Sequence, residues 1–302
     1  MKKYALILIL SGLVVAMILY SAYIAPRPSI AKNSEFASIQ DITPKTETAY
    51  KIIGGELVQD SQAILAPPDV AIWDYFRAVI PIDLRQNIAV LEIVQDPSLA
   101  LIANISSLDD LKSWKLKINK AEIYLESSQL ELNKDLLKAV FIHEIGHILT
   151  LNSDQISFDT SLKNIANKTD YPKIFADSES KCQPNYFVQE GCTKTESYLN
   201  QFYQKFWQSI WVDYLLAQNT SSNQLFTKRS QEFYTKNQNS FVSRIAAFSP
   251  EEDIAESFSA FVLRDRPPNL TTIADQKLAW LWDQPELVVI RQNILNNINN
   301  SK

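Results

Sequence analysis

The chain has 302 residues, of which 46% are hydrophobic and 21% are charged, and its formal net charge is −5. This length is enough for one large domain or two small ones. The charge is mild, and the sequence contains no basic block and no nucleic-acid motif, so we expect no nucleic-acid partner.

The N-terminus has the pattern of a targeting or membrane segment. Lys2 and Lys3 precede an uncharged apolar run of 21 residues from Ala5 to Ala25, which is long enough to span a bilayer. The best signal-peptidase site, in residues 29–31 (SIA), is a weak match. We therefore expect residues 1–25 to be an uncleaved anchor with its N-terminus inside, with a cleaved signal peptide as the alternative. Either interpretation takes the rest of the protein out of the cytosol.

The rest of the chain divides into a short linker and one domain. Residues 26–48 contain few large apolar side chains and are predicted to be a linker, and residues 49–302 a single domain. We expect a helix over 67–80, which begins with two prolines and an aspartate. Strand-like alternation or β-branched content predicts strands over 88–94, 99–105, 114–119 and 121–126.

The only two histidines of the chain, His143 and His147, form an HExxH motif with Glu144. On a helix, positions i and i+4 share one face, so both imidazoles can reach one metal ion, and the glutamate can hold a water there. The surrounding helix is apolar nearly all round and is predicted to be buried, with Asn133 as its N-cap. Buried imidazoles and a buried carboxylate need partners. The motif therefore predicts a zinc site.

The segment after this helix, from Asn152 to about Pro184, has a loop-like composition. Cys182 and Cys192 bracket a short stretch with proline and glycine, which in an oxidising compartment favours a local disulfide over two free thiols. Further helices are predicted over 195–217, 222–236, 272–283 and 285–297, and another begins at Ser249. The aromatic stripe within 195–217 fits a core face better than a binding face.

A catalytic zinc site needs a third protein ligand. No third histidine exists, so this ligand must be a carboxylate. The best candidates lie in residues 248–263 (FSPEEDIAESFSAFVL), where Glu252 and Glu256 share a helix face. Glu252 could bind zinc while Glu256 accepts the second ring N–H of a ligating histidine. Asp253 and Glu256 remain alternative ligands, and Ser249 with Glu252 could instead form a capping box.

HEIGH (143–147) followed by a distant helix with the pattern ExxAE (252–256) resembles the gluzincin class of zinc metallopeptidases, and in particular the protease domain of anthrax lethal factor and its relatives. The resemblance covers the two motifs and the order of elements, about a third of the chain. It implies an α+β, zincin-like domain, in which a small mixed sheet packs on the HExxH helix and a mostly helical part follows. It also implies that Glu252 is the zinc ligand.

One departure from this class concerns the oxyanion. Such enzymes often carry a tyrosine a few residues before the second motif, whereas residues 241–248 of this chain contain none. Ile245 stands near the expected position, and Tyr234 or Arg244 are the possible substitutes.

These observations predict an extracytosolic zinc metallopeptidase that hydrolyses peptide bonds, with Glu144 as general base for a zinc-activated water. An exposed edge strand, either 114–119 or 121–126, is expected to hold the peptide or protein substrate. The alternative is a catalytically inactive zincin-like domain, anchored in the envelope, that only binds a partner. The absent tyrosine motivates this alternative.

Overall fold

The structure is a computed structural model that describes residues 46–58, 66–97, 102–108, 111–125, 128–163, 171–218 and 223–301. The predicted anchor (1–25) and most of the predicted linker lie outside these ranges. Within them, no helix is both long and apolar enough to cross a membrane. β1 begins at Thr46, inside the last residues of the predicted linker.

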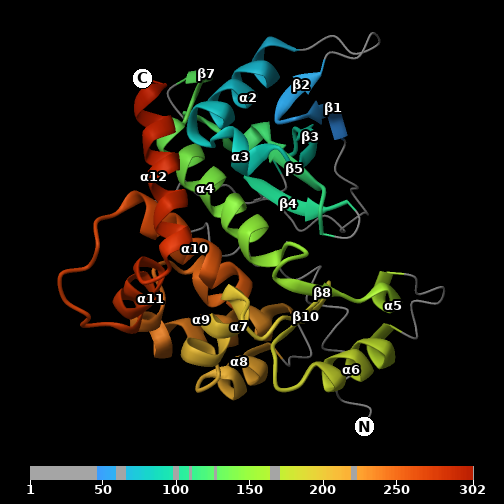
Figure 1. The fold of residues 1–302 in the computed structure, drawn as a ribbon, viewed down its shortest axis with the longest axis vertical. Coiled ribbons are helices and arrows are strands. Elements are labelled where there is room, and N and C mark those ends of the chain that lie inside the picture. The colour runs from blue at the N-terminus through green and yellow to red at the C-terminus, as the bar shows by residue number, and fades with distance from the viewer. Residues whose placement is uncertain are drawn as a thin grey trace, which may run out of the picture.

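A five-stranded mixed sheet forms one half of the protein (Figure 1). Its strands, in spatial order, are β2 (Glu56–Val58), β1 (Thr46–Ile53), β3 (Ile88–Val94), β5 (Trp114–Asn119) and β4 (Ala103–Ser107). β3 and β5 pair in parallel, and the other neighbours are antiparallel. The predicted strands 88–94 and 114–119 match β3 and β5. A separate two-stranded sheet joins β6 (Tyr124–Leu125) and β7 (Ser128–Leu132).

The central helix α4 (Lys134–Leu151) runs diagonally between this sheet and the helical half (Figure 1). As predicted, Asn133 caps it by accepting a hydrogen bond from the backbone N–H of Leu136. Its apolar side chains join one continuous core with the sheet and with α2 (Pro67–Val79). The T-shaped contact between Phe141 on α4 and Phe76 on α2 belongs to this core. The short helix α3 (Ile82–Arg85) follows α2.

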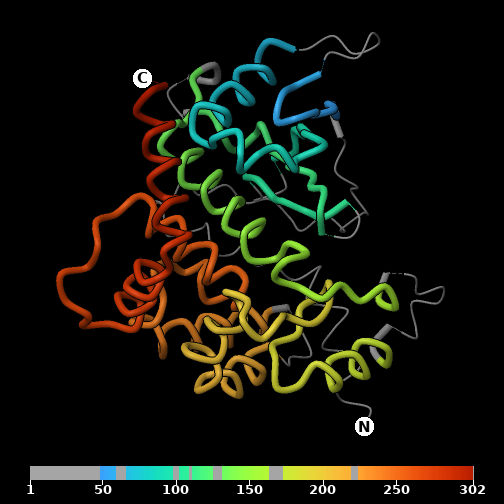
Figure 2. The backbone as a smooth tube through the Cα atoms, in the orientation of Figure 1, coloured from blue at the N-terminus to red at the C-terminus, as the bar shows by residue number. Residues whose placement is uncertain are grey.

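The C-terminal half is mostly helical, as expected. Its elements are α7 (Tyr198–Phe202), a π-helical turn (Tyr203–Trp207), α8 (Trp211–Gln218), α9 (Asn223–Asn237), α10 (Pro250–Leu263), α11 (Ile273–Trp282) and α12 (Pro285–Asn300). α10 packs along α4. α12 returns to the N-terminal half and lies beside α2 (Figure 2), where Asn297 donates to the carbonyls of Arg77 and Ala78.

Two predictions about secondary structure are wrong. The segment 152–184, predicted as a loop, contains β8 (Ile156–Phe158), α5 (Thr160–Lys163) and α6 (Tyr171–Cys182), and β8 pairs with β10 (Gly191–Thr193), which pairs with β9 (Phe187–Val188). These elements are short and only a small satellite core lies between them, so their hydrophobic signal is weak. The segment 195–217 is not one helix, because the π-helical turn and residues 208–210 divide it.

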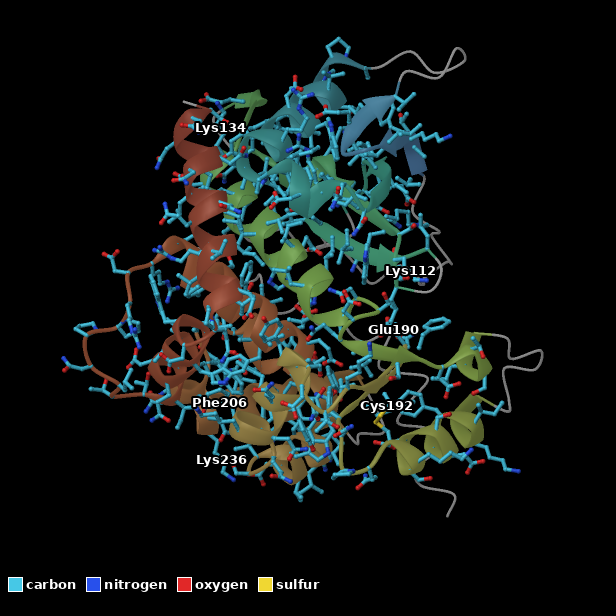
Figure 3. All side chains as sticks on the ribbon, in the orientation of Figure 1. Lys112, Lys134, Glu190, Cys192, Phe206 and Lys236 are labelled. Atoms are coloured by element: carbon cyan, nitrogen blue, oxygen red, sulfur yellow. A yellow bond between two sulfur atoms is a disulfide. The ribbon has the colours of Figure 1, made fainter. Side chains whose placement is uncertain are left out.

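The aromatic stripe of this divided segment faces the core. Phe202 and Trp207 are fully buried, and Phe206, labelled in Figure 3, is nearly so. The ammonium of the fully buried Lys277 lies 5.5 Å from the ring centroid of Phe202 and 5.9 Å from that of Phe206. The stripe is therefore structural rather than a binding surface.

Candidate metal centre

Helix α4 presents both histidines and Glu144 to one cavity. His143, Glu144 and His147 are each less than a tenth exposed, because the helix is covered on both sides. The Nε2 atoms of the two histidines lie 3.0 Å apart, which the i, i+4 spacing on one helix face allows. Two imidazole nitrogens at this distance can face the same ion.

Helix α10 brings the third side chain. Ser249 caps the helix by accepting a hydrogen bond from the backbone N–H of Glu252. The Glu252 carboxylate does not complete a capping box, however, because it is turned to the histidines. Its Oε2 lies 3.3 Å from Nε2 of His143, and its Oε1 lies 3.7 Å from Nε2 of His147. Capping by Ser249 and contact of Glu252 with the histidines therefore coexist.

The two helices are close enough for this contact because small residues lie between them. A Cβ atom added to Gly146 would lie 3.0 Å from the Cα atom of Ala255. Beyond this crossing, Ser259 donates a hydrogen bond to the carbonyl of Ala139. The glycine of the HEIGH motif thus allows α10 to bring its carboxylates within reach of α4.

The three side chains fit a tetrahedral ion of zinc size. One ligand atom from each of His143, His147 and Glu252 can be chosen so that all lie within 4.8 Å of one another. Zinc–ligand bonds of about 2.0–2.1 Å in a tetrahedron place the ligands about 3.3–3.4 Å apart. The donor set, two imidazoles and a carboxylate, is one that zinc commonly takes in catalytic sites.

Glu256 supports this arrangement from one turn further along α10. Its Oε1 lies 2.7 Å from Nδ1 of His143. A carboxylate that accepts Nδ1–H orients the ring and leaves Nε2 to face the ion. His147 has no such support, since its buried Nδ1 has no hydrogen-bond partner among the described residues.

The electrostatics of the two histidines differ. Burial alone would lower the pKa of His143, but Glu252 and Glu256 outweigh it and hold that pKa well above its usual value. Burial lowers the pKa of His147 to about 4. Burial would raise the pKa of Glu252, yet the two histidines lower it overall. The two carboxylates therefore favour the protonated form of His143, and the histidines favour the anionic form of Glu252.

The pKa of Glu144, unlike that of Glu252, is raised by its surroundings. Burial raises its pKa to about 7, although the charge of His143 and the backbone N–H of Ile105 on β4 lower it. Its buried Oε2 has no hydrogen-bond partner among the described residues. A carboxylate with a free oxygen and a pKa near neutrality can accept a proton and return it.

Asp253, an alternative ligand from the sequence, points away from the histidines. Its Oδ2 accepts hydrogen bonds from Nε1 of Trp207 at 2.7 Å and from Nζ of Lys277 at 2.5 Å. The aspartate therefore joins α10 to its neighbours and is not available to an ion between His143 and His147.

A cavity of about 300 Å³ opens beside these residues, between α4, α10 and β4. β4, an edge strand of the sheet, contributes Ala103 and Asn104 to the lining. The prediction that 114–119 is the edge strand is wrong, because β5 lies between β3 and β4. The segment 121–126 contains β6, which pairs with β7 in a separate two-stranded sheet, and none of its described residues lines the cavity. Strand order depends on pairing between distant segments, which the alternation within one segment does not report.

The cavity lining shows which side chain stands where the oxyanion-stabilising tyrosine was expected. Ile245 lines it, whereas neither Tyr234 nor Arg244 does. Tyr234 packs against the core near Phe241 instead. Sequence reasoning also missed Asn104 and Arg264, which line the cavity. Neither belongs to a motif, so no local signal could have found them.

Cys182 and Cys192 form a disulfide that joins the end of α6 to β10 (Figure 3). Their side chains belong to the small satellite core with Phe175 and Phe187. The bond closes the loop that carries β9, and it lies outside the cavity lining.

Comparisons with known proteins add little to this geometry. No family model matches the chain, and no curated protein matches it. A solved structure from Bacteroides caccae, described as a "putative zinc-binding metallo-peptidase", is similar over 81% of this chain and 83% of its own. The identity is 17% and the TM-score 0.31. At that TM-score the likeness carries no argument about this chain.

Proposed function

We propose that this protein is a zinc-dependent peptidase, held at the extracytosolic side of a membrane by its N-terminal segment or secreted after cleavage of that segment. The observation that carries the proposal is the convergence of His143, His147 and Glu252 on one point beside a buried oxygen of Glu144 that has no hydrogen-bond partner in the described part of the chain. His143, His147 and Glu252 are the proposed zinc ligands, and Glu256 is the residue that orients His143.

The chain's own residues account for proton transfer and positioning. When bound, zinc would lower the pKa of water and polarise a carbonyl. Glu144 accepts the proton of the attacking water at its buried Oε2, which has no hydrogen-bond partner among the described residues, and delivers it to the leaving amine. The edge strand β4 can pair with an extended peptide through its backbone, next to Glu144.

The experiment compares glutamate-to-glutamine variants in the full-length protein. Glu144→Gln is expected to keep one zinc per chain and to lose peptide cleavage by at least about 100-fold. Glu252→Gln is expected to lose both zinc and cleavage. Glu196→Gln, on an exposed surface position, is the matched control and should change neither. Wild-type cleavage rates in the Glu144→Gln variant would refute the role of that residue, and wild-type protein that retains no zinc would refute the metal site.

A catalytically inactive, envelope-anchored binding domain is the second candidate. The observation that favours it is Ile245, which lines the cavity at the place expected for an oxyanion-stabilising tyrosine. Zinc-dependent cleavage of any peptide in a diverse library, lost in Glu144→Gln, would exclude it.

A further inference from the structure

The cavity beside the candidate metal centre extends along the seam between α4 and α10. The two helices are antiparallel there: His143 meets Glu256, and Ala139, one turn earlier on α4, meets Ser259, one turn later on α10. The lining continues in the same direction to Arg264, where α10 ends. From Glu252 to Arg264 the helix rises by about 18 Å at 1.5 Å per residue.

The walls of this extension are apolar on three sides. They come from α4, from α10 and the turn before it, and from the residue that precedes β4. The larger apolar side chains are Ile102, Leu136, Val140, Val242, Ile245 and Leu263. Such walls favour apolar groups, because each buried methylene contributes about 0.8 kcal/mol.

Arg264 ends this apolar path with a positive charge. Apart from the two histidines, it is the only basic residue of the described lining. Its backbone is held on both sides, since its N–H donates to the carbonyl of Ala260 and its carbonyl accepts from Nη2 of Arg291. Its guanidinium forms no ion pair with any carboxylate of the described residues, although Arg266, two positions later, pairs with Asp283.

We propose that Arg264 binds a carboxylate of the substrate, and that the substrates are apolar peptide segments with one acidic group at a set distance from the cleaved bond. This proposal rests on the proposed peptidase function. The guanidinium fork matches a carboxylate in two parallel hydrogen bonds. An extended peptide rises about 3.3 Å per residue, so about 18 Å corresponds to five or six residues, fewer where the arginine side chain reaches back.

Two sources of the carboxylate share this chemistry: the C-terminus of a peptide and the side chain of an internal acid. The charges along the cavity favour either kind of carboxylate over a basic group of the substrate. Glu144, Glu252 and Glu256 lie at one end and Arg264 at the other, so a basic group at the far end would meet a like charge.

The test measures binding by fluorescence anisotropy to the full-length Glu144→Gln variant, loaded with zinc. Three kinds of labelled peptide share one apolar sequence. The first ends in a carboxylate and the second in an amide. The third also ends in an amide but carries one internal glutamate, which is placed in turn at positions three to seven. We expect at least one acidic peptide to bind about three- to tenfold more tightly than the neutral one. The acidic peptide that binds more tightly shows whether the carboxylate comes from the C-terminus of the substrate or from an internal side chain.

Substitution of the arginine then tests the assignment. Adding R264Q should abolish the preference for the acid, and R264E should reverse it in favour of a peptide with lysine at the same position. R266E is the matched control and should leave the preference unchanged. Equal binding of acidic and neutral peptides, or a preference that persists with R264Q, would overturn the proposal.

Cleavage of the same peptides by the wild-type protein separates the two proposals. If all are cleaved at the same rate and bound alike, the role of Arg264 fails and the peptidase function stands. If neither these peptides nor any member of the diverse library is cleaved while the binding preference depends on Arg264, the peptidase function fails and Arg264 remains a binding residue.

Discussion

Replacing Lys277 by methionine is expected to destabilise the protein strongly. Lys277 and Asp253 are both fully buried, with Nζ 2.5 Å from Oδ2 of the aspartate. The ammonium also donates to the carbonyl of Ser240. Removing one partner of a buried ion pair leaves a buried charge without compensation, which costs about 3–5 kcal/mol of unfolding free energy.

The loss should grow with pH. Burial raises the pKa of Asp253 to about 6, although Lys277 and Trp207 lower it. A raised pKa in the folded state means that folding binds a proton, so stability decreases as pH rises toward that pKa. Without Lys277 the pKa of Asp253 rises further. The unfolding free energy of the variant therefore keeps decreasing above pH 6, whereas that of the wild type no longer decreases there. The difference in unfolding free energy between the wild type and Lys277→Met should therefore widen by about 1.4 kcal/mol per pH unit above 6.

Urea unfolding of the metal-free protein, in chelator at pH 5, 6, 7 and 8, measures this gap. The double variant Asp253→Asn, Lys277→Met removes both charges and should recover much of the loss. Lys236→Met is the control, because Lys236 forms an exposed pair with Asp213 and should change stability by less than about 1 kcal/mol. A gap that stays constant from pH 6 to 8, or a double variant no more stable than the single one, would refute the reasoning.

Three further predictions follow from the site and its surroundings. Zinc binding at pH 7 should release about one proton, because His143 holds its proton until the metal replaces it; calorimetry in buffers of different ionisation enthalpy counts that proton, and no release would contradict the assigned protonation. Gly146→Val should push Ala255 away and weaken zinc binding at least about tenfold in equilibrium dialysis, with Gly146→Ala milder; unchanged affinity in both would show that the helix spacing is not limiting. Replacing Cys182 and Cys192 by serine should cost about 2–3 kcal/mol in urea unfolding while zinc content stays the same; loss of zinc would show that the disulfide also supports the site.

Much of the candidate site could be predicted from the sequence because each of its two motifs lies within a single helix. The positions of His143, Glu144 and His147 on one face follow from helical periodicity alone, and so does the shared face of Glu252 and Glu256. The close approach of α10 to α4 depends on one small residue from each helix, Gly146 and Ala255. Whether Glu252 or Asp253 faces the histidines could not be predicted from the local sequence. It depends on Trp207 and Lys277, which bind Asp253 and lie far from it along the chain.

The same division holds for the fold. β3 and β5 carry strong patterns of their own and were predicted with the right bounds. Which strand forms the edge beside the site depends on pairing between segments, and β4 has few large apolar residues to mark it. The elements between residues 152 and 184 are short and stabilised partly by the disulfide, so no long periodic pattern indicates them.

The contact between His143 and Glu256 joins residues 113 positions apart. α12, the last helix, binds back to α2 near the start of the domain through Asn297. During synthesis, the histidines are therefore made long before the carboxylates that would complete the candidate ligand set. Contacts of such long range form late in folding. A nascent chain that ends before Glu252 thus lacks both carboxylates of the candidate centre.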